Sequence, residues 1–226
     1  MIKFENTITP SAEQWMAIIN GLRNPMNSWD KSDSKIYIIA MNAEGFPEKH
    51  DFWAGYDDLN LMAQLRDAGT DHRKFMRMIT VYVDITAPLY WWKEFDTYKV
   101  GTVANSCSTM HKIAAKEFTL EDFSCEHLLP VSKDHLESTI DILNVYRDQY
   151  GVDTNPEIRK GYWWQMIQLL PSSYNQKRTV MLNYEVLANI YKSRKNHKLD
   201  EWSVGFMEWI ESLPYSELIT GKENKK

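Results

Sequence analysis

"KFMRMITVYVDITAPLYWWKEFD", residues 74–96, is the stretch that decides the fold. Between residues 75 and 85 the side chains alternate so that one face is the more apolar, as in a half-buried β-strand. The apolar positions of that face are Phe75, Ile79, Val81, Val83 and Ile85. Ala87-Pro88 then marks a turn, and Pro88 suits the first turn of a helix over residues 88–99. We therefore expect a strand, a turn and a helix in direct succession.

Outward from this stretch, the apolar spacing predicts further helices and two short strands. The predicted helices cover residues 11–23, 57–69, 133–150, 156–169, 184–196 and 200–213. The predicted strands cover residues 35–41 and 177–182, and residues 44–58 form a loop by composition. Ser11 and Asn183 suit the N-cap positions of the helices that follow them. The pattern predicts one α+β domain over residues 1–226, with a candidate subdomain change near residue 130 and a disordered tail at 220–226.

Composition limits the classes of partner. The chain has 226 residues, a net charge of −5 and 43% hydrophobic residues, which suits a globular domain. The acidic balance argues against broad nucleic-acid binding, because a surface that follows phosphates usually needs an excess of Lys and Arg. Cys107 and Cys125 are the only cysteines, so no disulfide framework is expected. No apolar run approaches the roughly 18 residues of a membrane helix, so we expect a cytoplasmic protein without membrane contact.

Two segments share the order and spacing of a known family. Residues 72–110 can be laid without a gap on H-x-T-P-x-E-H, a strand, a turn, a helix and then R-H-R-x-x-S-x-N-E-x-S-x-R-Y. Residues 169–194 carry a Leu-Pro pair and then Asn183, Asn189 and Arg194 at the spacing of a second family segment. On these motifs the chain resembles the flavin-dependent thymidylate synthases. The resemblance implies a ThyX-like fold, with a small antiparallel sheet packed with several helices.

Several side chains that carry the chemistry of this family are replaced here. Arg-His-Arg becomes Thr97-Tyr98-Lys99, the two serines become Thr102 and Cys107, the glutamate becomes Asn105, and an arginine becomes Thr109. Arginine suits phosphate binding because its planar fork donates two parallel charged hydrogen bonds. Each lost charge-assisted hydrogen bond costs roughly 1.5–3 kcal/mol. The chain is therefore expected to be a divergent member in which standard thymidylate synthase activity is doubtful.

The resemblance implies roles for the residues that occupy the family positions. The expected flavin (FAD) ligands are Tyr98, Lys99, Asn183 and Asn189. The expected ligands of a pyrimidine deoxynucleotide such as dUMP are Thr102, Asn105, Thr109 and Arg194. Helix capping by itself explains Asn183 fully. The resemblance also implies a homotetramer and a folate as source of the one-carbon unit.

Cys107 and His111 are the candidate catalytic residues. A Cys107 thiolate could add to C6 of a pyrimidine, if a neighbouring cation lowers its pKa. His111 follows four residues later, and on a helix these positions share one face, so proton transfer between them is a hypothesis. The alternatives are a small packing residue at 107 and a structural histidine at 111. The spacing of the remaining Cys and His residues fits no standard zinc pattern, and no metal site is predicted.

Three functional hypotheses follow from these residues. The first is an enzyme of pyrimidine nucleotide metabolism that modifies the C5–C6 region of the base, as a flavin-dependent nucleotide methyltransferase or oxidoreductase. The second is a catalytically inactive protein that keeps the fold for binding or assembly, because the charged signature residues are lost. The third is a chance resemblance over an unrelated fold.

Overall fold

The computed structural model describes residues 2–221, and they form two compact units. Unit 1 contains the chain up to Glu5 together with Asp84–Tyr98 and Ala104–Thr179. Unit 2 contains Asn6–Val83, Lys99–Val103 and the chain from Val180 onward. Of the tail predicted to be disordered, Thr220 ends a short helix, and residues 222–226 lie outside the described residues.

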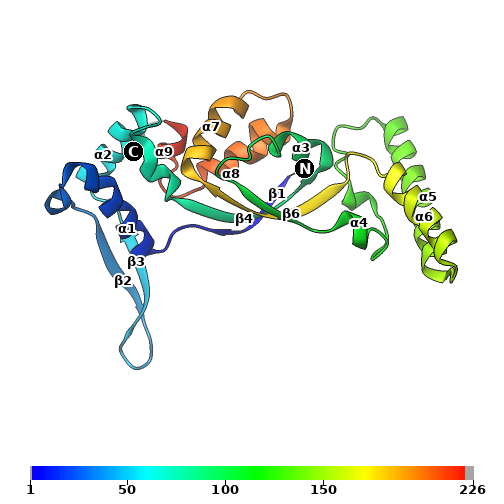
Figure 1. The fold of residues 1–226 in the computed structure, drawn as a ribbon, viewed down its shortest axis with the longest axis horizontal. Coiled ribbons are helices and arrows are strands. Elements are labelled where there is room, and N and C mark those ends of the chain that lie inside the picture. Colours follow the sequence, from blue (N-terminus) through cyan, green and yellow to red (C-terminus); the bar gives the residue numbers. More distant parts are fainter. Residues whose placement is uncertain (1, 222–226) are drawn as a thin grey trace. The chain divides into compact units, whose positions relative to one another are not determined.

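A small antiparallel sheet has the strand order β1-β4-β6-β5, and each of its strands contributes residues to both units (Figure 1). Its strands are β1 Lys3–Ile8, β4 Thr80–Pro88, β5 Val103–Ser106 and β6 Asn175–Asn183. The alternation predicted for β4 is confirmed, because Ile79, Val81, Val83 and Ile85 are all at most 1% exposed. The predicted start of this strand was too early. Arg73–Arg77 forms a 3-10 helix, since Met78 donates its N–H to the Phe75 carbonyl in a turn.

Unit 1 adds helices around its part of the sheet. They are α3 Leu89–Phe95, α4 Thr109–Lys112, α5 Pro130–Val152 and α6 Pro156–Leu169. α5 and α6 lie side by side as a helical hairpin (Figure 1), and Leu143 and Met166 are fully buried in the core beneath them. α3 ends before the predicted residue 99, because Thr97 and Tyr98 donate to carbonyls three residues back and tighten the chain into turns.

Unit 2 contains the remaining helices and a separate antiparallel hairpin. The elements are α1 Ala12–Arg23, β2 Lys35–Met41, β3 Pro47–Trp53, α2 Tyr56–Asp67, α7 Tyr184–Arg194, α8 Met207–Glu211 and α9 Glu217–Thr220. Ser11 caps α1 through a capping box, as predicted. The loop predicted at 44–58 was partly wrong, since β3 pairs with β2 there. Its residues 48–51 are all polar and exposed, so they carry no apolar alternation.

Asp58 is the polar centre of unit 2. It is fully buried, and Arg23, itself 4% exposed, donates Nε to its Oδ1 at 2.5 Å. Ser34 donates both its N–H and its hydroxyl to the other carboxylate oxygen, and Ser32 adds a further hydroxyl. Burial raises the pKa of Asp58, but the hydrogen bonds from Ser34, Ser32 and Arg23 outweigh it, and the net pKa lies below the usual value.

Gly55 allows Asp33 to approach the start of α2 closely. It is the N-cap residue and has no side chain to cap the helix, so Asp33 accepts the N–H groups of Asp57 and Asp58 instead. A Cβ on Gly55 would lie 2.0 Å from the Asp33 carboxyl carbon. The absence of a side chain at residue 55 therefore allows a residue from another segment to act as the cap.

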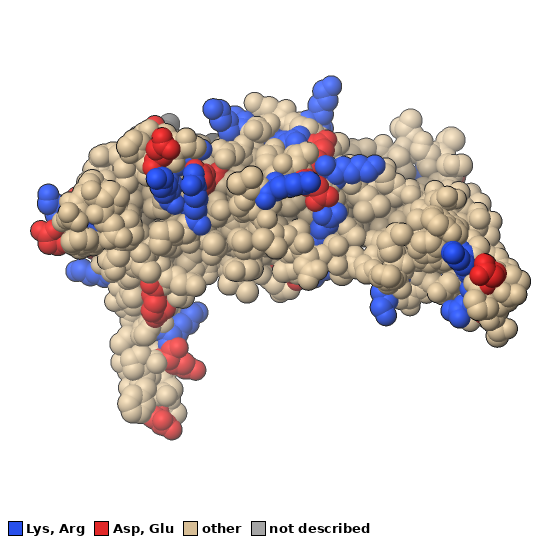
Figure 2. Space-filling model, in the orientation of Figure 1, with Lys and Arg blue, Asp and Glu red and all other residues tan. Residues whose placement is uncertain are grey.

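The face of the molecule drawn in Figure 2 mixes both signs of charge. Lys and Arg side chains lie among Asp and Glu side chains, and neither sign forms a continuous field there. Within residues 2–221, no helix combines the length and apolar character needed to cross a membrane.

We predict that Asp58→Asn lowers the free energy of unfolding by about 3–5 kcal/mol, because it leaves a buried arginine without its counter-charge. Urea denaturation at neutral pH measures this loss. Asp57→Asn is the matched control on the same helix turn, where the side chain is exposed and the expected loss is below about 1 kcal/mol. The contribution of Asp58 is complete above its unfolded pKa of about 4 and is lost as the pH falls further. Equal midpoints for the two variants would contradict the assignment.

Candidate functional site

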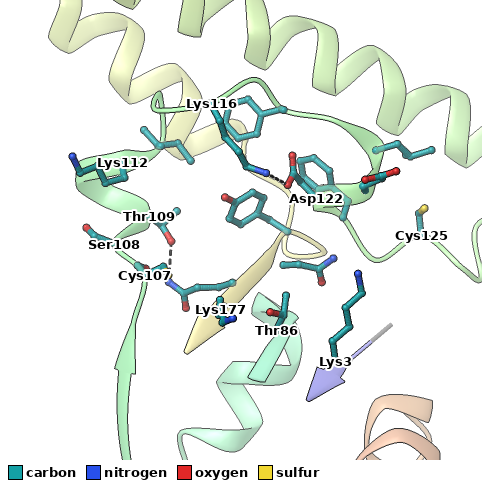
Figure 3. A pocket seen from close by; sticks show the side chains of 18 of the residues that line it. Lys3, Thr86, Cys107, Ser108, Thr109, Lys112, Lys116, Asp122, Cys125 and Lys177 are labelled. Carbon is teal, nitrogen blue, oxygen red and sulfur yellow. Dashed lines mark hydrogen bonds and ion pairs between the residues drawn. The ribbon is translucent and has the colours of Figure 1, made fainter. Parts of the chain in front are cut away.

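Unit 1 has an open cavity of about 860 Å³ beside the segment that joins β5 to α4 (Figure 3). The start of β6, the segment from Lys116 to Glu126, Lys3 of β1 and Thr86 of β4 complete its wall. The wall combines thiols, hydroxyls, amides and carboxylates with lysines and aromatic rings. Its polar members are Lys3, Thr86, Cys107, Ser108, Thr109, Lys112, Lys116, Glu121, Asp122, Cys125, Glu126, Asn175, Gln176 and Lys177.

The amide of Gln176 fixes the β5–α4 segment. Its Nε2 donates to the Cys107 carbonyl at 3.1 Å and to Thr109 Oγ1 at 2.9 Å. The backbone supports the same contact, since Cys107 donates its N–H to the Lys177 carbonyl at 2.9 Å. A side chain on β6 thus holds both predicted residues, Cys107 and Thr109, at the edge of the cavity.

Arg178 fixes the orientation of that amide. Its Nε donates to Gln176 Oε1 at 3.0 Å, and because arginine cannot accept, the amide oxygen must face it. The guanidinium lies 4.2 Å from the centre of the Trp92 ring and also donates to Asp96 at 2.7 Å. Trp92 Nε1 in turn donates to the Gln176 carbonyl at 2.9 Å. These contacts join α3 to β6 behind the cavity wall.

The lysines of the cavity fall into two groups. Lys116 is paired with Asp122, and Lys177 lies within 3.2 Å of carboxylates from β1 and β4, which raise its pKa. Lys3 and Lys112 have no carboxylate partner among residues 2–221. Figure 3 shows Lys3 extending from β1 toward the middle of the cavity and Lys112 directed away from it. Lys3 is therefore the cation best placed to meet an anion inside.

Tyr174 supplies a neutral hydrogen-bonding group on an aromatic wall. Its ring meets Phe118 and Phe123 edge-on, with centroids 6.2 and 5.6 Å away. Burial, followed by the negative charge of Asp122, raises the pKa of its phenol. The hydroxyl therefore keeps its proton across neutral pH and can donate to an acceptor on a ligand.

The structure separates the two predicted catalytic residues. Cys107 lies after the end of β5 and is exposed, and His111 lies inside α4, where its N–H donates to the capping hydroxyl of Ser108. The premise that residues 107 and 111 share a helix face is wrong, because α4 begins only at Thr109. His111 lines a second pocket, and Cys125 lies at the far end of the first cavity from Cys107 (Figure 3).

The other predicted ligands are not among the residues that line this cavity, and several are engaged by the protein. Asn183 caps α7 through Oδ1, as predicted, and its Nδ2 donates to the Gly101 carbonyl at 3.4 Å, next to Thr102. Asn189 accepts from Arg73 at 3.1 Å. Arg194 lies 5.1 Å from the Trp202 ring and is half-buried.

Two further predicted residues follow the end of α3, and a third lies within β5. Tyr98 is half-buried in the turn after α3, and Lys99 is exposed just beyond it. Asn105 is exposed on β5. Within residues 2–221, no group of three or more His, Cys, Asp and Glu side chains could hold a metal ion.

Sequence reasoning missed three residues of the cavity. Lys3, Tyr174 and Gln176 come from segments far from residue 107 in the chain, and pairing between strands brings them there. None carries a local motif. The nearest signal was the strand predicted at 177–182, whose true start at Asn175 would have placed Gln176 on a strand.

Solved structures share this fold at low sequence identity. Thymidylate Synthase X (ThyX) from Helicobacter pylori, crystallised with FAD and dUMP, matches with a TM-score of 0.61 and 13% identity, over 97% of this chain and 95% of that chain. A second structure of the flavin-dependent thymidylate synthase ThyX from Helicobacter pylori, complexed with FAD and dUMP, gives 0.59 and 12%, over 97% and 96%.

At this level of identity, the matches show the fold alone. No family model and no curated protein matches the sequence. The predicted α+β class with a ThyX-like fold is confirmed, and the alternative of an unrelated fold is wrong.

Proposed function

We propose that the 860 Å³ cavity of unit 1 binds a pyrimidine deoxynucleotide of the dUMP type and that Cys107 reacts with its base. The observation that carries this proposal is the position of Cys107 and Thr109, two residues of the signature segment, on the wall of a cavity that also holds an unpaired lysine and aromatic rings. The structural neighbours, which were crystallised with dUMP, support the same ligand class.

The two ends of the cavity suit the two ends of such a ligand. Lys3 supplies a cation for the phosphate, and Cys107 lies at the opposite side (Figure 3). Tyr174 and the amide of Asn175 lie on the wall, and both can hydrogen-bond to a carbonyl oxygen of the base.

The reaction available to Cys107 is reversible addition to the base. Its thiolate forms a bond from Sγ to C6, the electron pair of the C5–C6 bond moves toward C5 and O4, and C5 takes a proton from water. Reversal removes a proton from C5 and breaks the bond from sulfur to C6. The base is returned intact with its C5 hydrogen exchanged for one from solvent.

Flavin binding has less support from the side chains of one copy of the chain. Asn183 uses its side chain to cap α7 and to hold Gly101, and Asn189 is held by Arg73. Lys99 is the one cation among the four predicted ligands. These groups do not fit a flavin diphosphate by themselves, and the proposed chemistry contains no step through flavin. FAD, folate and the homotetramer stay predictions.

We expect Lys3→Ala to weaken dUMP binding about tenfold or more, as loss of one charge-assisted hydrogen bond to phosphate would. Isothermal titration calorimetry measures the affinity. Lys133→Ala, which removes an exposed lysine of α5 outside the cavity, is the control and should leave binding unchanged. Equal dUMP affinities for the two variants would show that Lys3 does not bind the phosphate. Arg194 does not line this cavity, and wild-type affinity in Arg194→Ala would exclude the nucleotide-binding role that the family resemblance implies for it.

A second prediction concerns the chemistry alone. In D₂O, dUMP incubated with the protein should lose its H5 proton signal in NMR spectra, because addition of Cys107 and its reversal exchange that hydrogen. Cys107→Ala should abolish the exchange. Cys125→Ala is the matched control, since it removes the other thiol of the same cavity and should leave the rate unchanged. Exchange that survives Cys107→Ala would show that this thiol is not the nucleophile.

The second candidate function is a non-catalytic binding protein with this fold. The specific observation behind it is that Thr97 and Thr109, which replace two arginines, use their hydroxyls within the protein: Thr97 donates to the Glu94 carbonyl, and Thr109 accepts from Gln176. Binding of dUMP without H5 exchange, and with no flavin absorbance after FAD is added and the excess removed, would favour this candidate. A retained flavin band would instead favour redox chemistry on the nucleotide.

A further inference from the structure

We propose that a second pocket in unit 1 binds a small phosphate-bearing compound with a flat ring, such as a nucleoside diphosphate. The pocket has a volume of about 930 Å³ and lies between α4 with the turn that follows it, the end of α5 and the start of α6. Its volume is in the range of sites that hold small molecules. The side chains that define its character are His111, Lys112, Tyr150, Arg159, Lys160 and Trp163.

The charge of this pocket has one sign. Lys112, Arg159 and Lys160 line it together with His111, and no carboxylate is among the described residues of its wall. None of the three permanent cations has an ion-pair partner within residues 2–221. The chain as a whole carries a net charge of −5, so this local excess runs against the general balance. Three unpaired cations around one cavity favour an anion as the occupant.

Arg159 is prepared for a phosphate. Its guanidinium carbon lies 4.6 Å from the centre of the Tyr150 ring, and this stacking limits the orientations of the fork. Its Nε is buried and has no hydrogen-bond partner among the described residues, so only the two terminal nitrogens can reach an occupant. The side chain as a whole is half-buried and lines the pocket. These terminal nitrogens can donate two parallel hydrogen bonds to a phosphate.

The start of α6 adds to the same field. Pro156 and Arg159 lie in the first turn of this 14-residue helix, which Asn155 caps. The partial positive charge of a helix N-terminus favours anions within its first turn. The helix end and the three cations therefore act on the same occupant.

Trp163 provides the surface for a flat ring. It lines the pocket, and its Nε1 donates to the Met110 carbonyl at 2.8 Å, which fixes the indole against the segment that contains α4. Because this donor is satisfied within the protein, the ring offers its apolar face rather than a hydrogen bond. An occupant that has only phosphate would leave this face unused, so we infer a ring as well as a phosphate.

The second pocket is distinct from the 860 Å³ cavity, although the two are neighbours. Lys112 and Ile113 line both, and Cys107, Thr109 and Gln176 line only the first of the two. The segment that contains α4 is the wall between them. A ligand in the second pocket therefore does not compete for the groups proposed to bind dUMP, namely Lys3, Cys107, Tyr174 and Asn175.

The test uses ADP and inorganic pyrophosphate as probes and calorimetry as the measurement. We expect ADP to bind the full chain and pyrophosphate to compete with it. Lys160→Ala, at an exposed position where folding is not at risk, should weaken ADP binding about tenfold. Arg159→Lys keeps the charge but loses the fork, and it should weaken binding at least as much. Trp163→Phe should weaken ADP binding and leave pyrophosphate binding unchanged.

Two controls separate this pocket from the rest of the surface. Lys133→Ala removes an exposed lysine of α5 outside the pocket and should bind ADP as the wild type does. Lys3→Ala lies in the first cavity and should do the same. Equal ADP affinity for Lys160→Ala and Lys133→Ala would overturn the proposal, and so would loss of ADP binding in Lys3→Ala. Binding of a single-stranded oligonucleotide with no binding of ADP at millimolar concentration would also overturn it.

Discussion

The amide of Gln176 is the contact on which the candidate site depends. The amide nitrogen donates to the Cys107 carbonyl and to the Thr109 hydroxyl, and the amide oxygen accepts from Arg178. Because Arg178 can only donate, the amide has one orientation, and the β5–α4 segment has one register against β6. The stacked pair of Arg178 and Trp92 carries this constraint to α3. The cavity wall is therefore positioned by a polar network rather than by hydrophobic packing alone.

The same network gives the hydroxyl groups of Thr97 and Thr109 a structural part. The Thr109 hydroxyl completes the contact with Gln176. Thr97 closes the turn after α3. Both side chains belong to the framework of unit 1. The cation directed into the cavity comes from another segment, Lys3 on β1 (Figure 3).

Local patterns predicted the parts of the fold that depend on neighbouring residues. The buried face of β4, the cap at Ser11 and the cap at Asn183 all follow from spacing within a few positions. β3 escaped prediction because its polar residues gain their order from pairing with β2. The cavity could not be predicted either, since Lys3 and Gln176 approach Cys107 only through the order of strands in the sheet. The spacing of Cys107 and His111 led to a wrong prediction, because it assumed one helix through both residues, whereas α4 begins only at Thr109.

The single turn of helix between the two pockets has a thermodynamic consequence. Lys112 and Ile113 belong to both walls, and α4 itself has four residues. A ligand in one pocket that shifts Lys112 changes the side chains available for binding in the other pocket. Linkage then requires each occupant to alter the affinity of the other by the same factor. Because one turn of helix separates the two pockets, binding in one would change binding in the other without any movement of the surrounding sheet.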